Sequence, residues 1–372
     1  MNKLILFIFI IFASWNTVIA QKALEFASGD GNPTGIGPVV STTIRFRHNT
    51  DNPTGNTFAT YTPPLTVTAT LSNDQYVYPI SPLPGNPASM LGFTAGAGSV
   101  YYNPLSDGGG VNADFTASGA SAGNGISVID NFALRFSHYI APLETAGVLT
   151  NARARVVDLT LAFNRPVNNP ILHLSGLGGS AVIDFTAEFD LLSSNVPVTL
   201  SKSSGTANLI VETVSGTQRI SNNSLVPSGA NHQHGSILAA GNGITTIALR
   251  VYLRGGGDGT NSDWMVNNNT RESWSLSLSL LENCTKPPIT GTPDSYTQTG
   301  VSSLVGFAGG WPGNVPNGFI AIESKDQGFV ITRVSSSAAI TAPVEGMLIY
   351  DIAANCVKLY SGTWNCLAKD CN

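Results

Sequence analysis

The sequence predicts an all-β protein: an antiparallel, jelly-roll-like β-sandwich, followed by a proline-rich linker and a small β-rich C-terminal module. Three observations favour this fold class. Apolar residues recur at every second position in short segments such as Ile183 to Phe189 and Trp274 to Leu280, which is the period of strands with one buried face. Helical periodicity is almost absent. The 39 Gly and 21 Pro residues separate the segments at intervals typical of sandwiches and barrels.

The first 20 residues have the pattern of a secretory signal peptide. An apolar run from Leu4 to Ala13 is followed by the small-residue ending Val18-Ile-Ala20, and the run is too short to span a bilayer as a helix. We expect cleavage after Ala20, which makes the mature protein extracellular or bound to the cell surface. No later segment approaches the roughly 20 apolar residues of a membrane span, so no transmembrane segment is expected in the mature chain.

Composition divides the rest of the chain. We expect residues 21–283 to form the sandwich and to act as a binding domain. Residues 284–300 are predicted to be a linker, because Cys284 to Pro293 combines three prolines with polar residues. Residues 301–372 are predicted to form the C-terminal module, which ends in a hairpin around Ser361-Gly362.

The charge distribution excludes two classes of partner. Only 11% of the residues are charged and the formal net charge is -5, against a usual charged fraction of about 25%. Since no cluster of Lys and Arg interrupts this pattern, the basic surface needed for nucleic acid or an anionic membrane is absent from the sequence.

No catalytic motif has the context that its chemistry requires, so we expect a protein without enzymatic activity. Gly119-Ala-Ser-Ala-Gly123 has the spacing of a nucleophile elbow, but it lies in a Ser/Ala/Gly-rich loop without the flanking strand and helix. His232 and His234 are expected to be solvated loop residues, with a zinc-binding pair as the alternative. His173 lies in an apolar strand and is expected to be a hydrogen-bonded structural residue.

A polar loop after the strand around Leu253 supplies the candidate binding residues. Asp258, Asn261 and Asp263 lie close together in this Gly-rich loop, and calcium favours several carboxylate and amide oxygens brought together by tight turns. The same loop carries Trp264, so Trp264, Asn261 and Asp263 are candidates for a lectin-like glycan site. The competing interpretation is a surface turn with Trp264 in the core. An open indole face is the condition for sugar stacking.

Export places all four cysteines in an oxidising compartment, where an even number predicts disulfides. Three pairings are possible, and in each of them Cys284 pairs with a cysteine of the C-terminal module. A two-residue turn at Ser361-Gly362 would place Cys366 opposite Val357, which argues against a bridge within the hairpin. The cysteines are Cys284, Cys356, Cys366 and Cys371.

The C-terminal module contains a series of distinctive short segments, which are Ile322-Glu-Ser324, Gly328 to Arg333, Ala342 to Asp351, Asn355-Cys356 and Leu359 to Trp364. In these segments it resembles a stretch found in secreted and surface proteins of Bacteroidetes and in tail-fibre-like proteins. Gln327 and Thr332 depart from the usual Lys and Pro of that pattern. The resemblance implies a surface-exposed accessory module without catalytic residues.

A second resemblance concerns the sandwich. Leu159 to Val167 and Asn169 to Gly179 are similar to a strand pair in the lectin-like, non-repetitive domain of streptococcal fibrillar surface adhesins. It implies a role in adhesion.

Together these patterns predict a secreted or cell-surface adhesin whose sandwich binds a glycan or an extracellular host protein. The alternative is a structural surface or appendage component that assembles with copies of itself. A secreted glycan hydrolase is a third hypothesis. Against the third, Glu188 and Asp190 alternate with core residues and are expected to lie on a solvated face, which explains them without catalysis.

Overall fold

The computed structural model describes residues 23–77, 87–93, 99–180, 184–223, 232–264, 267–281, 296, 298–302, 311–313, 320–324 and 328–367. The chain divides into two compact units, Met1–Glu282 and Asn283–Asn372. The predicted signal peptide and its cleavage site lie outside the described residues, as do Cys284, Cys371 and most of the predicted linker.

The first unit contains two large sheets whose strand pairs are all antiparallel. In the first sheet, β18 occupies the centre: it pairs with β10 on one side and with both β1 and β8 on the other. We call this sheet the β18 sheet. Its strands are β13 (Thr199–Gly205), β16 (Gln233–Ala240), β10 (Ile171–Leu177), β18 (Arg271–Leu281), β1 (Ala23–Glu25), β3 (Arg47–Asn49), β4 (Phe58–Thr60), β8 (Phe132–Tyr139), β6 (Ser89–Leu91) and β7 (Tyr102–Pro104).

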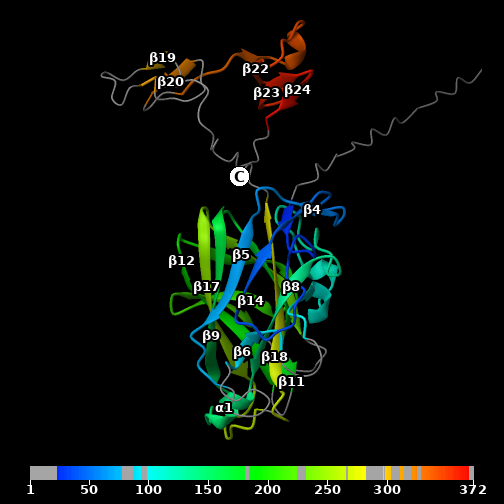
Figure 1. Cartoon of the computed structure of the whole chain (residues 1–372), viewed down its shortest axis with the longest axis vertical. Coiled ribbons are helices and arrows are strands. Elements are labelled where there is room, and N and C mark those ends of the chain that lie inside the picture. The colour runs from blue at the N-terminus through cyan, green and yellow to red at the C-terminus, as the bar shows by residue number, and fades with distance from the viewer. Residues whose placement is uncertain are drawn as a thin grey trace, which may run out of the picture. The chain divides into compact units, whose positions relative to one another are not determined.

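The second sheet, the β17 sheet, is built around three long strands that run along the length of the sandwich (Figure 1). A small strand, β11 (Gly179–Ser180), pairs with β12 at its end, and α1 (Ala141–Thr145) lies at one end of the sandwich. In order across the sheet, the strands are β14 (Leu209–Val214), β15 (Thr217–Asn222), β12 (Asp184–Ser194), β17 (Ile244–Gly255), β9 (Arg153–Val167), β5 (Thr66–Ser72) and β2 (Ser41–Arg45).

The core lies between the two sheets and is built from alternate residues of their strands. Trp274 of β18 stacks on Phe136 of β8 with ring centroids 4.4 Å apart, and it meets Phe189 of β12 edge-on at 4.7 Å. Each fully buried Leu, Ile or Phe side chain contributes about 1.5–3 kcal/mol through burial. The prediction of an all-β protein with an antiparallel sandwich is confirmed.

The outer face of the β18 sheet differs from the expectation of one buried and one solvated face. Ser275, Ser277 and Ser279 alternate with core residues of β18, yet all three are buried. Part of the outer face is covered by the segment between β7 and β8, which includes η1 (Leu105–Gly108) and η2 (Asn112–Asp114). The backbone N–H of Ser118 in this segment donates to Ser279 Oγ at 3.0 Å. Ser279 therefore binds a polypeptide segment in the place of water.

The second unit is small and consists of two sheets. Strands β19 (Thr299–Ser302) and β20 (Ile320–Glu323) form a parallel pair. The first two residues of β19 therefore lie within the predicted linker, residues 284–300. The other sheet has the order β21-β22-β23-β24, in which β21 and β22 are parallel and the last three strands form a meander. Its elements are β21 (Arg333–Val334), η3 (Ser337–Ala339), β22 (Leu348–Asp351), β23 (Cys356–Ser361) and β24 (Thr363–Cys366).

None of the helices in the described parts of the chain is both long and apolar enough to traverse a bilayer.

Candidate functional site

The loop that follows β17 holds the residues predicted to bind a glycan, but it does not present an aromatic face. Trp264 is completely buried. Its indole N–H donates to the carbonyl oxygen of Val148 at 2.7 Å, and its backbone N–H donates to the Glu144 carboxylate at 3.0 Å. Since sugar stacking requires an open ring face, the lectin-like role predicted for Trp264 is wrong, and its competing interpretation as a core residue holds.

The three oxygen-bearing residues of this loop are exposed, and two of them cap local turns. A carboxylate oxygen of Asp258 accepts hydrogen bonds from the backbone N–H and the hydroxyl of Thr260, at 2.9 and 2.8 Å. The amide oxygen of Asn261 accepts from the backbone N–H of Asp263 at 3.2 Å. Across the described ranges, no three His, Cys, Asp or Glu side chains gather in a way that would hold a metal. Calcium binding by Asp258, Asn261 and Asp263 stays a prediction.

His173 is the hydrogen-bonded structural residue that its strand predicted. Its Nδ1 and Nε2 atoms lie 2.8 and 2.9 Å from the hydroxyls of Ser236 and Ser279. Complete burial lowers the pKa of this imidazole to about 3. With both nitrogens occupied and no access to solvent, the ring is not placed to activate a nucleophile for an external substrate.

The prediction of solvated loop histidines is wrong for His234. This residue lies in β16, is buried, and accepts a hydrogen bond from the Gly176 backbone N–H to Nδ1 at 3.1 Å. The hydroxyl of Ser175 lies at the same distance from Nδ1. The reason is again the covered outer face of the β18 sheet, which the alternation of residues 232–234 does not reveal.

Glu188 and Asp190 face outward as their alternation predicts, but arginines surround them, so solvation does not explain them. Arg153 donates to both carboxylates, and its Nη2 lies 2.8 Å from Asp190. Arg254 pairs with Glu188, and Arg219 pairs with Asp190 at 2.8 Å. Only 3% of the Glu188 side chain is exposed. Two carboxylates engaged in this way form a structural ion-pair network across β9, β12, β15 and β17.

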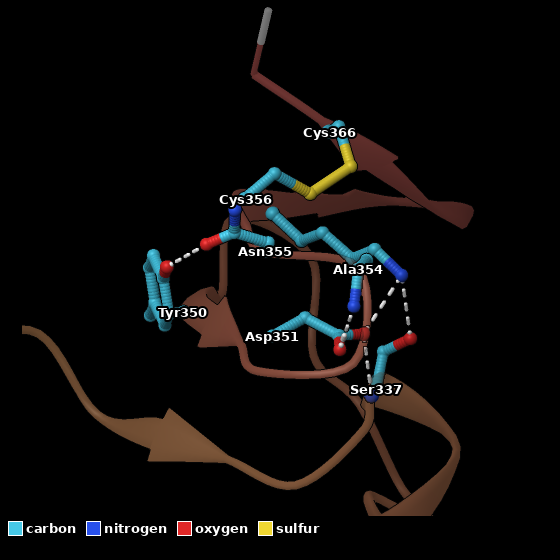
Figure 2. The surroundings of a disulfide bond; sticks show 8 residues. Ser337, Tyr350, Asp351, Ala354, Asn355, Cys356 and Cys366 are labelled. Atoms are coloured by element: carbon cyan, nitrogen blue, oxygen red, sulfur yellow. Dashed lines mark hydrogen bonds and ion pairs between the residues drawn. A yellow bond between two sulfur atoms is a disulfide. The ribbon is translucent and has the colours of Figure 1, made fainter. Parts of the chain in front are cut away.

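The C-terminal sheet contains a disulfide between Cys356 and Cys366, with Cα atoms 5.8 Å apart (Figure 2). The expectation that the hairpin register disfavours this bridge is wrong. Ser361 pairs directly with Thr363, which leaves Gly362 alone at the turn, and Cys366 therefore lies opposite Lys358. Cys356 and Lys358 are on the same side of β23, so the two sulfur atoms meet diagonally across the strand pair.

The same face of the sheet is fixed by a buried carboxylate. Asp351 accepts hydrogen bonds from the Lys358 ammonium at 2.8 Å, the Ala354 backbone N–H at 3.0 Å and the Ser337 backbone N–H at 2.8 Å (Figure 2). These donors hold the pKa of Asp351 well below its ordinary value. The Tyr350 hydroxyl also donates to the side chain of Asn355 in the turn between β22 and β23.

The described residues of the second unit expose far more apolar side chains than they bury. Ile349 and Cys356 are the buried apolar residues among them. A unit with so small a core lacks the burial that normally stabilises a domain. Its exposed large apolar residues are Tyr296, Val301, Ile320, Ile322, Phe329, Val330, Val344, Leu348, Ile352 and Leu367.

Comparison with known proteins identifies one relation. Residues 313–372 match the model of a family described as a phage tail like trimerisation region. No curated protein and no solved structure matches the chain. The match agrees with the tail-fibre-like resemblance of the C-terminal module. It does not bear on a relation to Bacteroidetes surface proteins or to adhesins.

The sequence alone did not point to the exposed apolar residues of the second unit as a functional surface. Their signal was present: Val301 alternates with polar or small residues, and Ile320 and Ile322 flank Ala321. Such alternation predicts that one face of a strand is covered, but it does not say whether the cover comes from the same chain or from another.

Proposed function

We propose that this protein is a structural, non-enzymatic component of an extracellular appendage or surface layer, which assembles with copies of itself into a trimer through its C-terminal unit. The observation that carries the proposal is the match of residues 313–372 to a phage tail like trimerisation region. This is the self-assembling alternative that the sequence predicted, and it has more support than the adhesin hypothesis.

The energetics of the C-terminal unit favour the same conclusion. Nine large apolar side chains are exposed in its described residues beyond Thr299, and the buried apolar residues are Ile349 and Cys356. Burying apolar surface stabilises a protein by about 25 cal/mol per Å². Association with further copies supplies the burial that the isolated unit lacks, as in small domains that depend on oligomerisation.

The disulfide supports an extracellular location. Disulfides such as Cys356–Cys366 form and persist in oxidising compartments. In this proposal the sandwich is the part that the trimer displays. A glycan site built on Trp264 loses its support, because this ring has no open face.

The oligomeric state tests the proposal. We expect the chain from Gln21 to Asn372 to have the mass of a trimer in size-exclusion chromatography with light scattering. A chain that ends at Glu282 keeps the sandwich unit and is expected to be a monomer. A full chain that stays monomeric at micromolar concentrations would contradict the proposal, and so would trimers of the truncated chain.

A further inference from the structure

We infer that the trimer interface is centred on the face of the β19–β20 pair that the described residues leave uncovered, together with Phe329 and Val330. This inference rests on the proposed trimeric function and adds the residues through which the copies meet. We call this surface the β19–β20 face; its residues are Val301, Ile320, Ile322, Phe329 and Val330.

The register of the two strands defines the face. Val301 lies beside Ile322, and Thr299 lies beside Ile320. Because neighbouring residues in a sheet project to the same side, these side chains share one face, and Gly300 and Ala321 belong to the other. The three apolar members are exposed: Val301 by 59%, Ile320 by 51% and Ile322 by 55%.

The opposite face of the pair is covered by its own chain. A Cβ atom added to Gly300 would lie 2.5 Å from the indole Cη2 of Trp311 and 3.0 Å from Cβ of Pro312. Trp311 and Pro312 therefore pack directly on the backbone of β19, at a distance that only glycine permits. The pair has one face covered from within the chain and one apolar face without cover from the described residues.

Phe329 and Val330 extend the uncovered surface. Among the described residues of the unit they are the most exposed large apolar side chains, at 71% and 77%. Together with Val301 and Ile322 they line a groove of about 480 Å³, whose remaining lining residues are Ser302, Glu323, Ser324 and Gly328. Four apolar side chains, from the two strands and from the segment after β20, therefore meet at this groove beside a polar edge.

The occupant that fits this surface is the same surface of other copies. Parallel sheets occur with both faces covered, and two strands alone are not stable in water. Rotational symmetry brings identical residues together, so the apolar side chains of this face can meet their own copies. Glu323 also lines the groove, but its register beside Ser302 directs it to the other side of the strands. The family match supplies the number of copies, three. Since β19 precedes residue 313, the interface would begin before the matched region.

A second apolar surface in the unit provides the competing location. Leu348, Leu359 and Leu367 lie on the face of the C-terminal sheet opposite the disulfide, and Leu348 and Leu367 are 46% exposed. Its strands form a four-stranded, disulfide-bonded sheet. That sheet depends less on outside cover than the two-stranded pair does.

The test compares charged substitutions in the full chain. Ile322→Asp should weaken trimer assembly more than tenfold. Assembly would bury a carboxylate of each copy at the position where the wild-type trimer buries the Ile322 side chain. Val344→Asp is the matched control: Val344 is 64% exposed in the same unit but outside the β19–β20 face, and this variant should remain trimeric. Sedimentation velocity over a range of concentrations measures both.

Cross-linking gives a second readout that does not depend on loss of assembly. Ile322→Cys should form a covalent dimer under mild oxidation, since two of three symmetry-related thiols can bond, and Val344→Cys should not. A trimeric wild type in which Ile322→Asp stays trimeric, Ile322→Cys does not cross-link and Leu348→Asp dissociates would overturn the inference and leave the proposed function intact. A monomeric wild type would instead overturn the proposed function.

Discussion

The indole of Trp264 fills a space against Gly255 at the end of β17. A Cβ atom on Gly255 would lie 2.7 Å from Cη2 of this ring and 2.1 Å from the carbonyl oxygen of Thr150. The glycine therefore allows the loop to close over the tryptophan. Trp264 thus stabilises the loop by packing against its inner side.

A first prediction concerns this side chain. Trp264→Ala should lower the free energy of unfolding by about 3–5 kcal/mol, because it removes a fully buried aromatic side chain. Trp264→Phe keeps much of the packing but leaves the Val148 carbonyl without its donor, and it should cost about 1–3 kcal/mol. Urea unfolding measures both changes. Equal losses for the two variants would contradict the argument.

A second prediction follows from a buried carboxyl group inside the sandwich. Burial raises the pKa of Glu272 from its ordinary 4.5 to about 8, although the backbone N–H groups of Gly178 and Ala187 donate to it and lower the pKa. The pKa of Glu25 is raised by burial to about 7. A raised pKa in the folded state means that the stabilising contribution is present below about pH 4.5 and is lost as the pH rises.

The stability of the protein should therefore fall between about pH 5 and 8, by on the order of 1 kcal/mol per pH unit for each titrating group. Glu272→Gln keeps the acceptor oxygen but cannot ionise, so it should remove most of the dependence near pH 8. Glu25→Gln should act only up to about pH 7. Thermal unfolding across this pH range measures the effect, and parallel curves for wild type and Glu272→Gln would refute it.

The loop after β17 contains the residues predicted to bind calcium. If Asp258 and Asp263 bind Ca²⁺, the melting temperature should rise with millimolar Ca²⁺, because a ligand that binds only the folded state stabilises it. Asp258→Asn with Asp263→Asn should abolish the rise, and chelator should reverse it in the wild type. A melting temperature that is indifferent to both Ca²⁺ and chelator excludes the site.

The disulfide of the C-terminal hairpin supports a fourth prediction. Cys356 and Cys366 are separated by ten positions, and on the chain-entropy model closing such a loop contributes about 2–3 kcal/mol. The double substitution to Ser should destabilise the C-terminal unit by this amount and leave the unfolding of the sandwich unchanged. The second unit has few buried apolar residues, so trimers should also dissociate at a lower temperature. Hydrogen exchange of the β22–β24 amides locates the change.

Much of the sandwich could be predicted because the alternation of apolar and polar residues can be recognised within single short segments. Alternation in segments such as β12 and β18 specifies which side chains face the core, whatever the strand order. The covered outer face of the β18 sheet could not be predicted, since its cover is the segment before β8, far from β18 in the chain and without strand periodicity. The Cys356–Cys366 bridge was predicted to be disfavoured because the turn was assumed to contain two residues. The turn contains Gly362 alone, which shifts the register of the hairpin by one residue.

For the whole molecule, the pairing of Cys356 with Cys366 reduces the three possible connectivities to one. If all four cysteines pair within one chain, Cys284 is joined to Cys371, and the end of the sandwich segment is tied to the chain terminus. Closing a loop of this length would contribute about 4–5 kcal/mol on the chain-entropy model. Peptide mapping without reduction should recover the Cys284–Cys371 peptide. Free thiols at these positions, or Cys284 joined to another molecule, would show that no such link exists.

The central position of β18 has a consequence for the order of folding. This strand, near the end of the first unit, is the direct partner of β1, β8 and β10, which lie up to about 250 positions earlier in the chain. Contacts at such separation require large loops to close before they are rewarded, which makes folding slow. The sandwich cannot close during synthesis until Leu281 has left the ribosome. The β18 sheet therefore lacks its central strand, and the core face of the β17 sheet lacks its cover, for nearly the whole time that the first unit is being made.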